Sequence, residues 1–130
     1  MKRFIGFLLV AAIFTGCATK EEKARTNLTQ VWKVHKVLEN GNDVTANFNN
    51  SQVEYRMSFD NNGSFLETYS FNSNQVSVNG TWFFSDGINK ISLEDSNQSR
   101  IYQVNLLDEN HFNITDLGSS NDRLVEFVPQ

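Results

Sequence analysis

From residue 30 onward, apolar and polar side chains alternate along several short segments, and no segment sustains a helical period. Successive side chains of a β-strand point to opposite faces of a sheet, so this alternation predicts strands that bury one face in a core. The clearest example is segment 53–60, in which apolar side chains alternate with Glu54, Arg56 and Ser58. The pattern predicts eight strands, with approximate bounds 30–39, 53–60, 64–71, 76–85, 88–94, 100–107, 111–116 and 122–128.

The first predicted strand and the segment that follows it are less regular. Within 30–39, Trp32, Val34 and Leu38 are predicted to share one face, with Val37 on the opposite face. Segment 44–51 fits no strand pattern and is compatible with a short helical turn.

Turn-forming residues separate the predicted strands. Asp60-Asn61-Asn62-Gly63 and Asp86-Gly87 indicate tight hairpins, because Asn and Gly tolerate the positive φ that such turns require. Segment 72–75 is predicted to be a loop. Eight short antiparallel strands joined in this way predict an all-β domain, either an up-and-down barrel or a two-sheet β-sandwich.

The first 16 residues have a different pattern, with a positive start followed by an apolar run. Lys2 and Arg3 precede the apolar segment 4–14, and small residues follow it. This is the pattern of a secretion signal peptide, and the run is shorter than the roughly 20 apolar residues that span a bilayer. We therefore expect residues 1–16 to be removed, which leaves one domain of ordinary size.

Cys17 is the only cysteine of the chain, and Phe14-Thr15-Gly16-Cys17 resembles a bacterial lipobox. The resemblance implies that the chain is cut before Cys17 and that its thiol and new amino group are acylated. Phe14 stands where a lipobox more commonly has Leu. Each buried CH₂ contributes about 0.8 kcal/mol, so two or three acyl chains would anchor the protein stably in a membrane. The alternative is a lone buried or free thiol that follows a signal sequence.

Residues 17–28 are predicted to be the lipidated Cys and a polar tether. Within them, Lys20-Glu21-Glu22 is similar to the export signal of Bacteroidota lipoproteins, which implies the outer membrane and the cell surface. The alternative is a solvated tether that carries no export signal. Without the signal, nine basic side chains stand against fifteen acidic ones. This balance disfavours nucleic acid and anionic lipid surfaces as partners, since both require clustered positive charge.

Two tryptophan-centred segments, 31–34 (VWKV) and 79–84 (NGTWFF), are similar to those of small lipocalin-like lipoproteins of Bacteroidota, as is YRMSFDNNGSF at 55–65. The resemblance implies a lipocalin-like barrel over residues 29–130. In lipocalins a Gly-x-Trp triplet lies on the first strand at the closed end of the barrel. This chain has Gln30 in place of that glycine, although Gly80-Thr81-Trp82 keeps the triplet on an inner strand. The resemblance therefore supports the fold more than it supports ligand binding.

The sequence contains no pattern typical of an enzyme, a metal centre or a cofactor site. His35 and His111 are the only histidines, and neither has another ligand at a metal-binding spacing. There is no phosphate-binding glycine loop and no nucleophile elbow. Glu54, Glu67 and Glu94 lie in predicted strands, but acids on exposed strand faces are common. We therefore expect a protein without catalytic activity, metal or cofactor.

Side chains that share a phase on neighbouring strands are the candidates for walls of a ligand cavity. They are Tyr55, Met57, Phe59, Glu67, Tyr69 and Trp82. An eight-stranded barrel is either filled by its side chains or has room for one small ligand. A buried, unpaired carboxylate is costly, so Glu67 marks the mouth, a polar contact to a ligand, or an outward strand face. Two functions are open: an interaction module for an envelope protein, and a carrier of a small apolar ligand.

Overall fold

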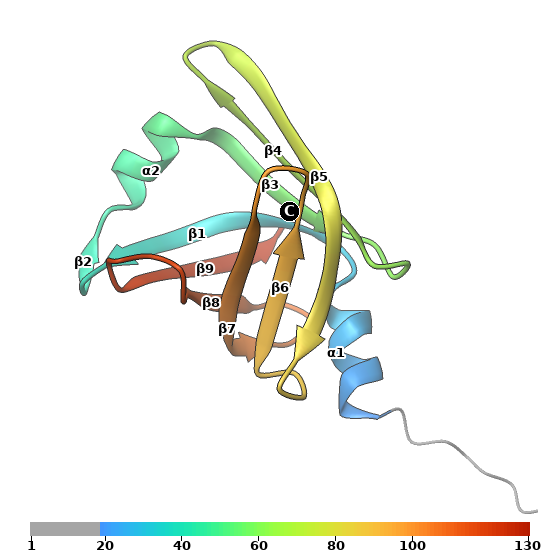
Figure 1. Cartoon of the computed structure of the whole chain (residues 1–130). Coiled ribbons are helices and arrows are strands. Elements are labelled where there is room, and N and C mark those ends of the chain that lie inside the picture. Colours follow the sequence, from blue (N-terminus) through green and yellow to red (C-terminus); the bar gives the residue numbers. More distant parts are fainter. Residues whose placement is uncertain (1–18) are drawn as a thin grey trace, which may run out of the picture.

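The computed structural model describes residues 19–130. The predicted signal peptide and Cys17 lie outside the described residues. The described part of the chain folds into a closed β-barrel with two short helices, α1 (Lys20–Leu28) and α2 (Thr45–Ser51), on opposite sides of it (Figure 1).

The barrel is antiparallel throughout and has the simplest possible strand order. The strands are β1 (Val31–Glu39), β2 (Asn42–Asp43), β3 (Val53–Phe59), β4 (Ser64–Phe71), β5 (Asn74–Ser85), β6 (Lys90–Glu94), β7 (Ser99–Leu107), β8 (Phe112–Asp116) and β9 (Arg123–Pro129). From β3 to β9 each strand pairs with the next, and β1 pairs with both β3 and β9. The two-residue β2 folds back and pairs antiparallel with the last two residues of β1. The predicted up-and-down barrel is therefore confirmed, and the sandwich alternative is wrong.

Two predicted strand boundaries need correction. In place of the predicted loop at 72–75, Asn72 and Ser73 alone form the turn, both with positive φ, and β5 already begins at Asn74. After Asp86 and Gly87, which also have positive φ, the turn extends to Asn89 and β6 begins at Lys90. The hairpin at Gly63 (φ 90°) has the predicted form.

The prediction that Val37 lies opposite Trp32 is wrong, because both side chains are fully buried. The β1–β9 register shifts between Val34 and Lys36. An extra residue at such a bulge reverses the phase of every later side chain on the strand. Strict alternation cannot anticipate this, since no residue type in the segment marks the bulge.

The predicted polar tether is a helix from Lys20 to its end at Leu28. Thr19 caps the helix, because its hydroxyl accepts a hydrogen bond from Glu22 N while the Glu22 carboxylate accepts one from Thr19 N. Leu28 is 0% exposed and packs in the barrel core. None of the helices within 19–130 is both long and apolar enough to cross a bilayer.

Aromatic rings fill the end of the barrel that α1 covers. Phe59 packs edge-to-face against Trp82 at 5.8 Å and against Phe112 at 5.7 Å, and Trp32 lies 5.6 Å from Phe112. Trp32 Nε1 donates to the Leu28 carbonyl at 2.9 Å. We call this the closed end of the barrel.

Candidate functional site

The opposite end of the barrel interior contains a cavity of about 200 Å³. Five of the six side chains that the sequence proposes line it: Tyr55, Met57, Phe59, Glu67 and Tyr69. The lining also includes the apolar residues Ile91, Leu93, Phe112, Ile114, Val125 and Phe127 and the polar or charged residues Gln52, Gln98, Arg100, Tyr102, Asp116 and Arg123. The barrel interior is thus filled at one end and hollow at the other.

Trp82 is the candidate that does not line the cavity. It lies at the closed end, where Nε1 donates to the Asp60 carbonyl at 3.0 Å. The Arg25 guanidinium of α1 lies 4.7 Å from the centre of its ring. Trp82 therefore joins α1 to the barrel and contributes no wall to the cavity.

Glu67 points into the barrel, so the outward interpretation of this residue is wrong. The residue is 7% exposed, and its Oε2 accepts hydrogen bonds from Tyr55 Oη and, at 3.1 Å, from Arg100 Nη1. Hydrogen bonds to an ionised group are among the stronger ones in proteins. They offset the cost of taking a carboxylate out of water, and they explain how an acid fits among aromatic side chains.

Arg100 and Tyr102 belong to the same cluster and were missed by the sequence analysis. Both lie on β7 and line the cavity, with Arg100 Nη1 3.4 Å from Tyr102 Oη. The Arg100 guanidinium also lies 5.8 Å from the centre of the Phe65 ring. Its Nε and Nη2 atoms are buried without a hydrogen-bond partner among residues 19–130.

Burial and neighbouring charges fix the protonation of this cluster at neutral pH. Burial, followed by the charge of Glu67, raises the pKa of Tyr55 well above its ordinary value. Burial also raises the pKa of Tyr102, although Arg100 opposes the shift. Burial alone would lower the pKa of Arg100, but Tyr102 and Glu67 outweigh it and raise that pKa. The cavity therefore contains neutral phenols beside a charged guanidinium.

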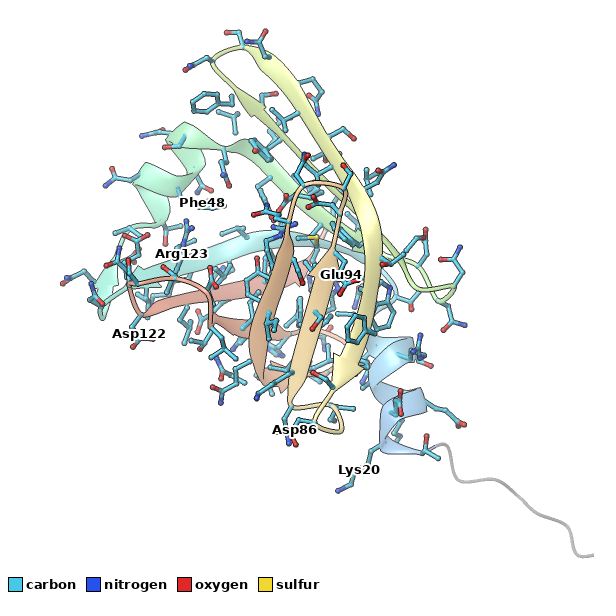
Figure 2. The ribbon with its side chains drawn as sticks, in the orientation of Figure 1. Lys20, Phe48, Asp86, Glu94, Asp122 and Arg123 are labelled. Atoms are coloured by element: carbon cyan, nitrogen blue, oxygen red, sulfur yellow. The ribbon has the colours of Figure 1, made fainter. Side chains whose placement is uncertain are left out.

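Phe48 of α2 lies at the mouth of the cavity. Its ring packs edge-to-face against Tyr55 at 5.4 Å, and the Arg123 guanidinium lies 5.3 Å from its centre. Figure 2 shows the Phe48 and Arg123 side chains close together at this side of the barrel. No residue of α2 is buried, and the N-cap residue Val44 makes no side-chain hydrogen bond. Phe48 and Thr45, whose hydroxyl accepts a hydrogen bond from Val37 N at 2.9 Å, both connect α2 to the barrel.

The other acids and histidines of the sequence analysis do not come together. Glu54 and Glu94 are exposed, away from the buried Glu67. His35 is exposed on β1, and His111 contacts Asp108 at 2.9 Å in an exposed turn. Within residues 19–130, no three His, Cys, Asp or Glu side chains lie close enough to hold a metal ion.

Comparison with known proteins identifies the family of this barrel. No functionally curated protein matches the chain. The family model of the lipocalin-like domain matches residues 28–114, well over half of the chain, from the end of α1 into β8. The chain therefore belongs to the lipocalin-like domain family.

Proposed function

We propose that this protein is a non-enzymatic binding module that carries one small, mostly apolar ligand in the cavity. The observation that carries the proposal is a hollow of about 200 Å³, lined by aromatic and aliphatic side chains together with polar ones such as Glu67 and Arg100, in a barrel whose other end is filled. Apolar cavities of about 150 Å³ bind benzene, whereas pockets for drug-sized ligands measure about 300–1,000 Å³. The size suits a single ring or a short chain rather than a sterol or haem.

A ligand panel graded by size tests this proposal. The melting temperature and tryptophan fluorescence of the solubilised full chain are measured with toluene, octanoate, palmitate, cholesterol and haem. A ligand at 100 times its Kd stabilises a protein by about 2.7 kcal/mol, so we expect the two small compounds to raise the melting temperature. Absence of any shift with both would contradict the carrier proposal and favour the envelope interaction module.

A pair of matched variants locates the binding. Leu93→Phe adds volume inside the cavity, while Leu66→Phe adds the same volume at a site that is 40% exposed on the outer wall. We expect Leu93→Phe to abolish the effect of toluene and Leu66→Phe to retain it. Equal effects in the two variants would place toluene outside the cavity.

We further propose that acyl chains at Cys17 hold the module at the outer membrane. The signal-like residues 1–16 and the lipobox-like residues 14–17 support this proposal. Cys17→Ser is expected to leave the protein uncut or soluble. A variant that is cut and still partitions with the membrane would contradict lipid anchoring.

Surface display is the corresponding proposal for Lys20-Glu21-Glu22. Because Glu22 also caps α1, its replacement would weaken the helix and confuse the result. The double variant Lys20→Ala with Glu21→Ala spares the cap. Protease added to intact cells is expected to degrade the wild type and to spare this variant. Full protection of the wild type would contradict surface display.

A further inference from the structure

We propose that the ligand is a small organic acid and that the guanidinium of Arg100 binds its carboxylate. This inference rests on the proposed carrier function and names its ligand class. Arg100 lies in the cavity wall beside Glu67 and Tyr102, and apolar side chains such as Ile91 and Leu93 line the same cavity. A small acid combines a carboxylate, which Arg100 can bind, with one ring or a short chain, which the apolar part of the cavity can hold.

The hydrogen-bond donors of Arg100 divide into a used side and an unused side. Nη1 donates to Glu67 Oε2 at 3.1 Å and lies 3.4 Å from Tyr102 Oη. Nε and Nη2 have no acceptor within residues 19–130, although both atoms are buried. Buried donors without an acceptor are rare and costly in native proteins. An acceptor supplied by a ligand would remove that cost.

The unused atoms form the edge of the guanidinium that fits a carboxylate. Nε and Nη2 point their N–H groups in parallel, and a carboxylate accepts both with its two oxygens. An alcohol or an amide carbonyl offers one acceptor atom to the same edge. The geometry therefore favours an acid over a neutral compound of the same size.

Glu67 has a positioning role in this arrangement. By accepting from Nη1 and from Tyr55 Oη, it holds one side of the guanidinium and leaves the other side to the ligand. In the empty barrel Nε and Nη2 are covered by neighbouring atoms, with the Phe65 ring 5.8 Å from the guanidinium carbon. The proposal thus requires Nε and Nη2 to become accessible from the cavity as the acid enters, while Nη1 stays hydrogen-bonded to Glu67.

The four charged side chains that line the cavity carry no net charge. Arg100 and Arg123 line it together with Glu67 and Asp116. Arg123 is at the mouth, where its Nε lies 3.6 Å from Glu39 on the outer side. The guanidinium groups of Arg123 and Arg100 both attract an entering acid, and the carboxylates of Glu39 and Glu67 beside them weaken that attraction.

Calorimetry with benzoate, benzamide and benzyl alcohol tests the inference on the solubilised full chain. The three probes share a ring and differ in the polar group. We expect benzoate to bind tightest. Arg100→Lys keeps a positive charge beside Glu67 but removes the two parallel N–H donors, so it should weaken benzoate binding by about 10- to 100-fold. It should change the binding of benzyl alcohol little.

Arg56→Lys is the matched control, because the Arg56 side chain donates to the Tyr55 carbonyl at 2.8 Å and does not line the cavity. Its affinity for benzoate should equal that of the wild type. Equal binding of the three probes, or equal losses in the two lysine variants, would overturn the inference and leave the carrier function standing. If none of the probes binds and toluene does not bind either, the carrier function itself fails.

Discussion

At the scale of single residues, the cavity depends on a polar group placed among aromatic side chains. Tyr55 and Arg100 both donate to the same oxygen of Glu67, so hydrogen bonds to Glu67 couple the three side chains. Removing one member of a buried ionic cluster leaves an uncompensated charge, which costs about 3–5 kcal/mol. The cluster is therefore sensitive to substitution and to pH.

The pH dependence of stability should report the buried tyrosines. Burial, then Glu67, raises the pKa of Tyr55 above 10.0 in the folded protein, and burial raises that of Tyr102 as well. As pH rises past about 10, the unfolded chain loses these protons first, so the folded state is progressively destabilised. The stabilisation is complete below pH 10 and is lost above it, with a slope of up to about 1.4 kcal/mol per pH unit for each tyrosine.

Urea unfolding of wild type and Tyr55→Phe between pH 8 and about 11.5 measures this slope. The variant lacks one of the two phenols, so its free energy of unfolding should fall less steeply above pH 10. The same slope in both proteins would show that Tyr55 titrates normally in the folded state.

Gly80 is a position where the barrel has no room for a side chain. A Cβ there would overlap the backbone oxygen of Glu94 and lie 2.8 Å from Phe65 Cε1. Since backbone cannot move aside cheaply, Gly80→Ala should cost about 1–3 kcal/mol or more of unfolding free energy. At Gly118 the nearest atom, Asp116 Oδ1, would be 3.5 Å away, so Gly118→Ala is the control. Equal effects of the two substitutions in thermal unfolding would refute the steric explanation.

Several site residues could be predicted from the sequence because their strands alternate clearly, whereas those on β7 could not because that strand has apolar residues in both phases. Tyr55, Met57 and Phe59 follow from the cleanest alternation in the chain. On β7, by contrast, Ile101 competes with the phase of Arg100 and Tyr102, and it is 45% exposed on the outside. A strand with apolar residues in both phases does not reveal its inner face, because alternation is its only signal.

At the scale of elements, α1 is a fixed part of the barrel rather than a tether. Leu28 is fully buried, Ala24 is 5% exposed, and Arg25 stacks on Trp82. The helix was missed because only two of its nine residues are apolar, too few for a periodic signal. Thr19 and Glu22 at capping-box spacing were the signal that could have indicated it.

Leu28→Ala tests how firmly α1 is attached. Removal of a fully buried leucine side chain costs about 2–5 kcal/mol, so this variant should unfold at clearly lower urea concentration. Leu66→Ala, on the outer wall at 40% exposure, should cost far less. If the two variants are equally stable, the packing of α1 contributes nothing to the fold.

At the scale of the whole molecule, the two ends of the barrel differ. Aromatic side chains fill the closed end, and the mouth of the cavity is at the other end. Two residues separate Cys17 from α1, and a residue spans at most about 3.6 Å, so an acylated Cys17 would keep α1 close to the lipid. Because α1 covers the closed end, the mouth should face away from the membrane. A ligand would then enter from the aqueous side.

Labels at the two ends test this orientation. The turn at Asp86 lies on the same side of the barrel as α1, as Figure 2 shows, whereas the hairpin between β4 and β5, which contains Asn72, lies at the other end (Figure 1). A fluorophore on Asp86→Cys should be quenched by lipid-borne quenchers more strongly than one on Asn72→Cys. Stronger quenching at Asn72→Cys than at Asp86→Cys would show that the mouth faces the bilayer.

The most direct test of the central claim, that the cavity holds a small ligand, uses Met57. The chain has two methionines, and Met1 lies in the predicted signal peptide, so methyl-labelled methionine gives one signal, that of Met57, from the mature protein. Met57 is 3% exposed and lines the cavity. With saturating toluene, the account predicts that the Met57 methyl signal shifts and shows nuclear Overhauser contacts to the toluene ring, and that Leu93→Phe abolishes both. An unchanged Met57 signal would contradict the account.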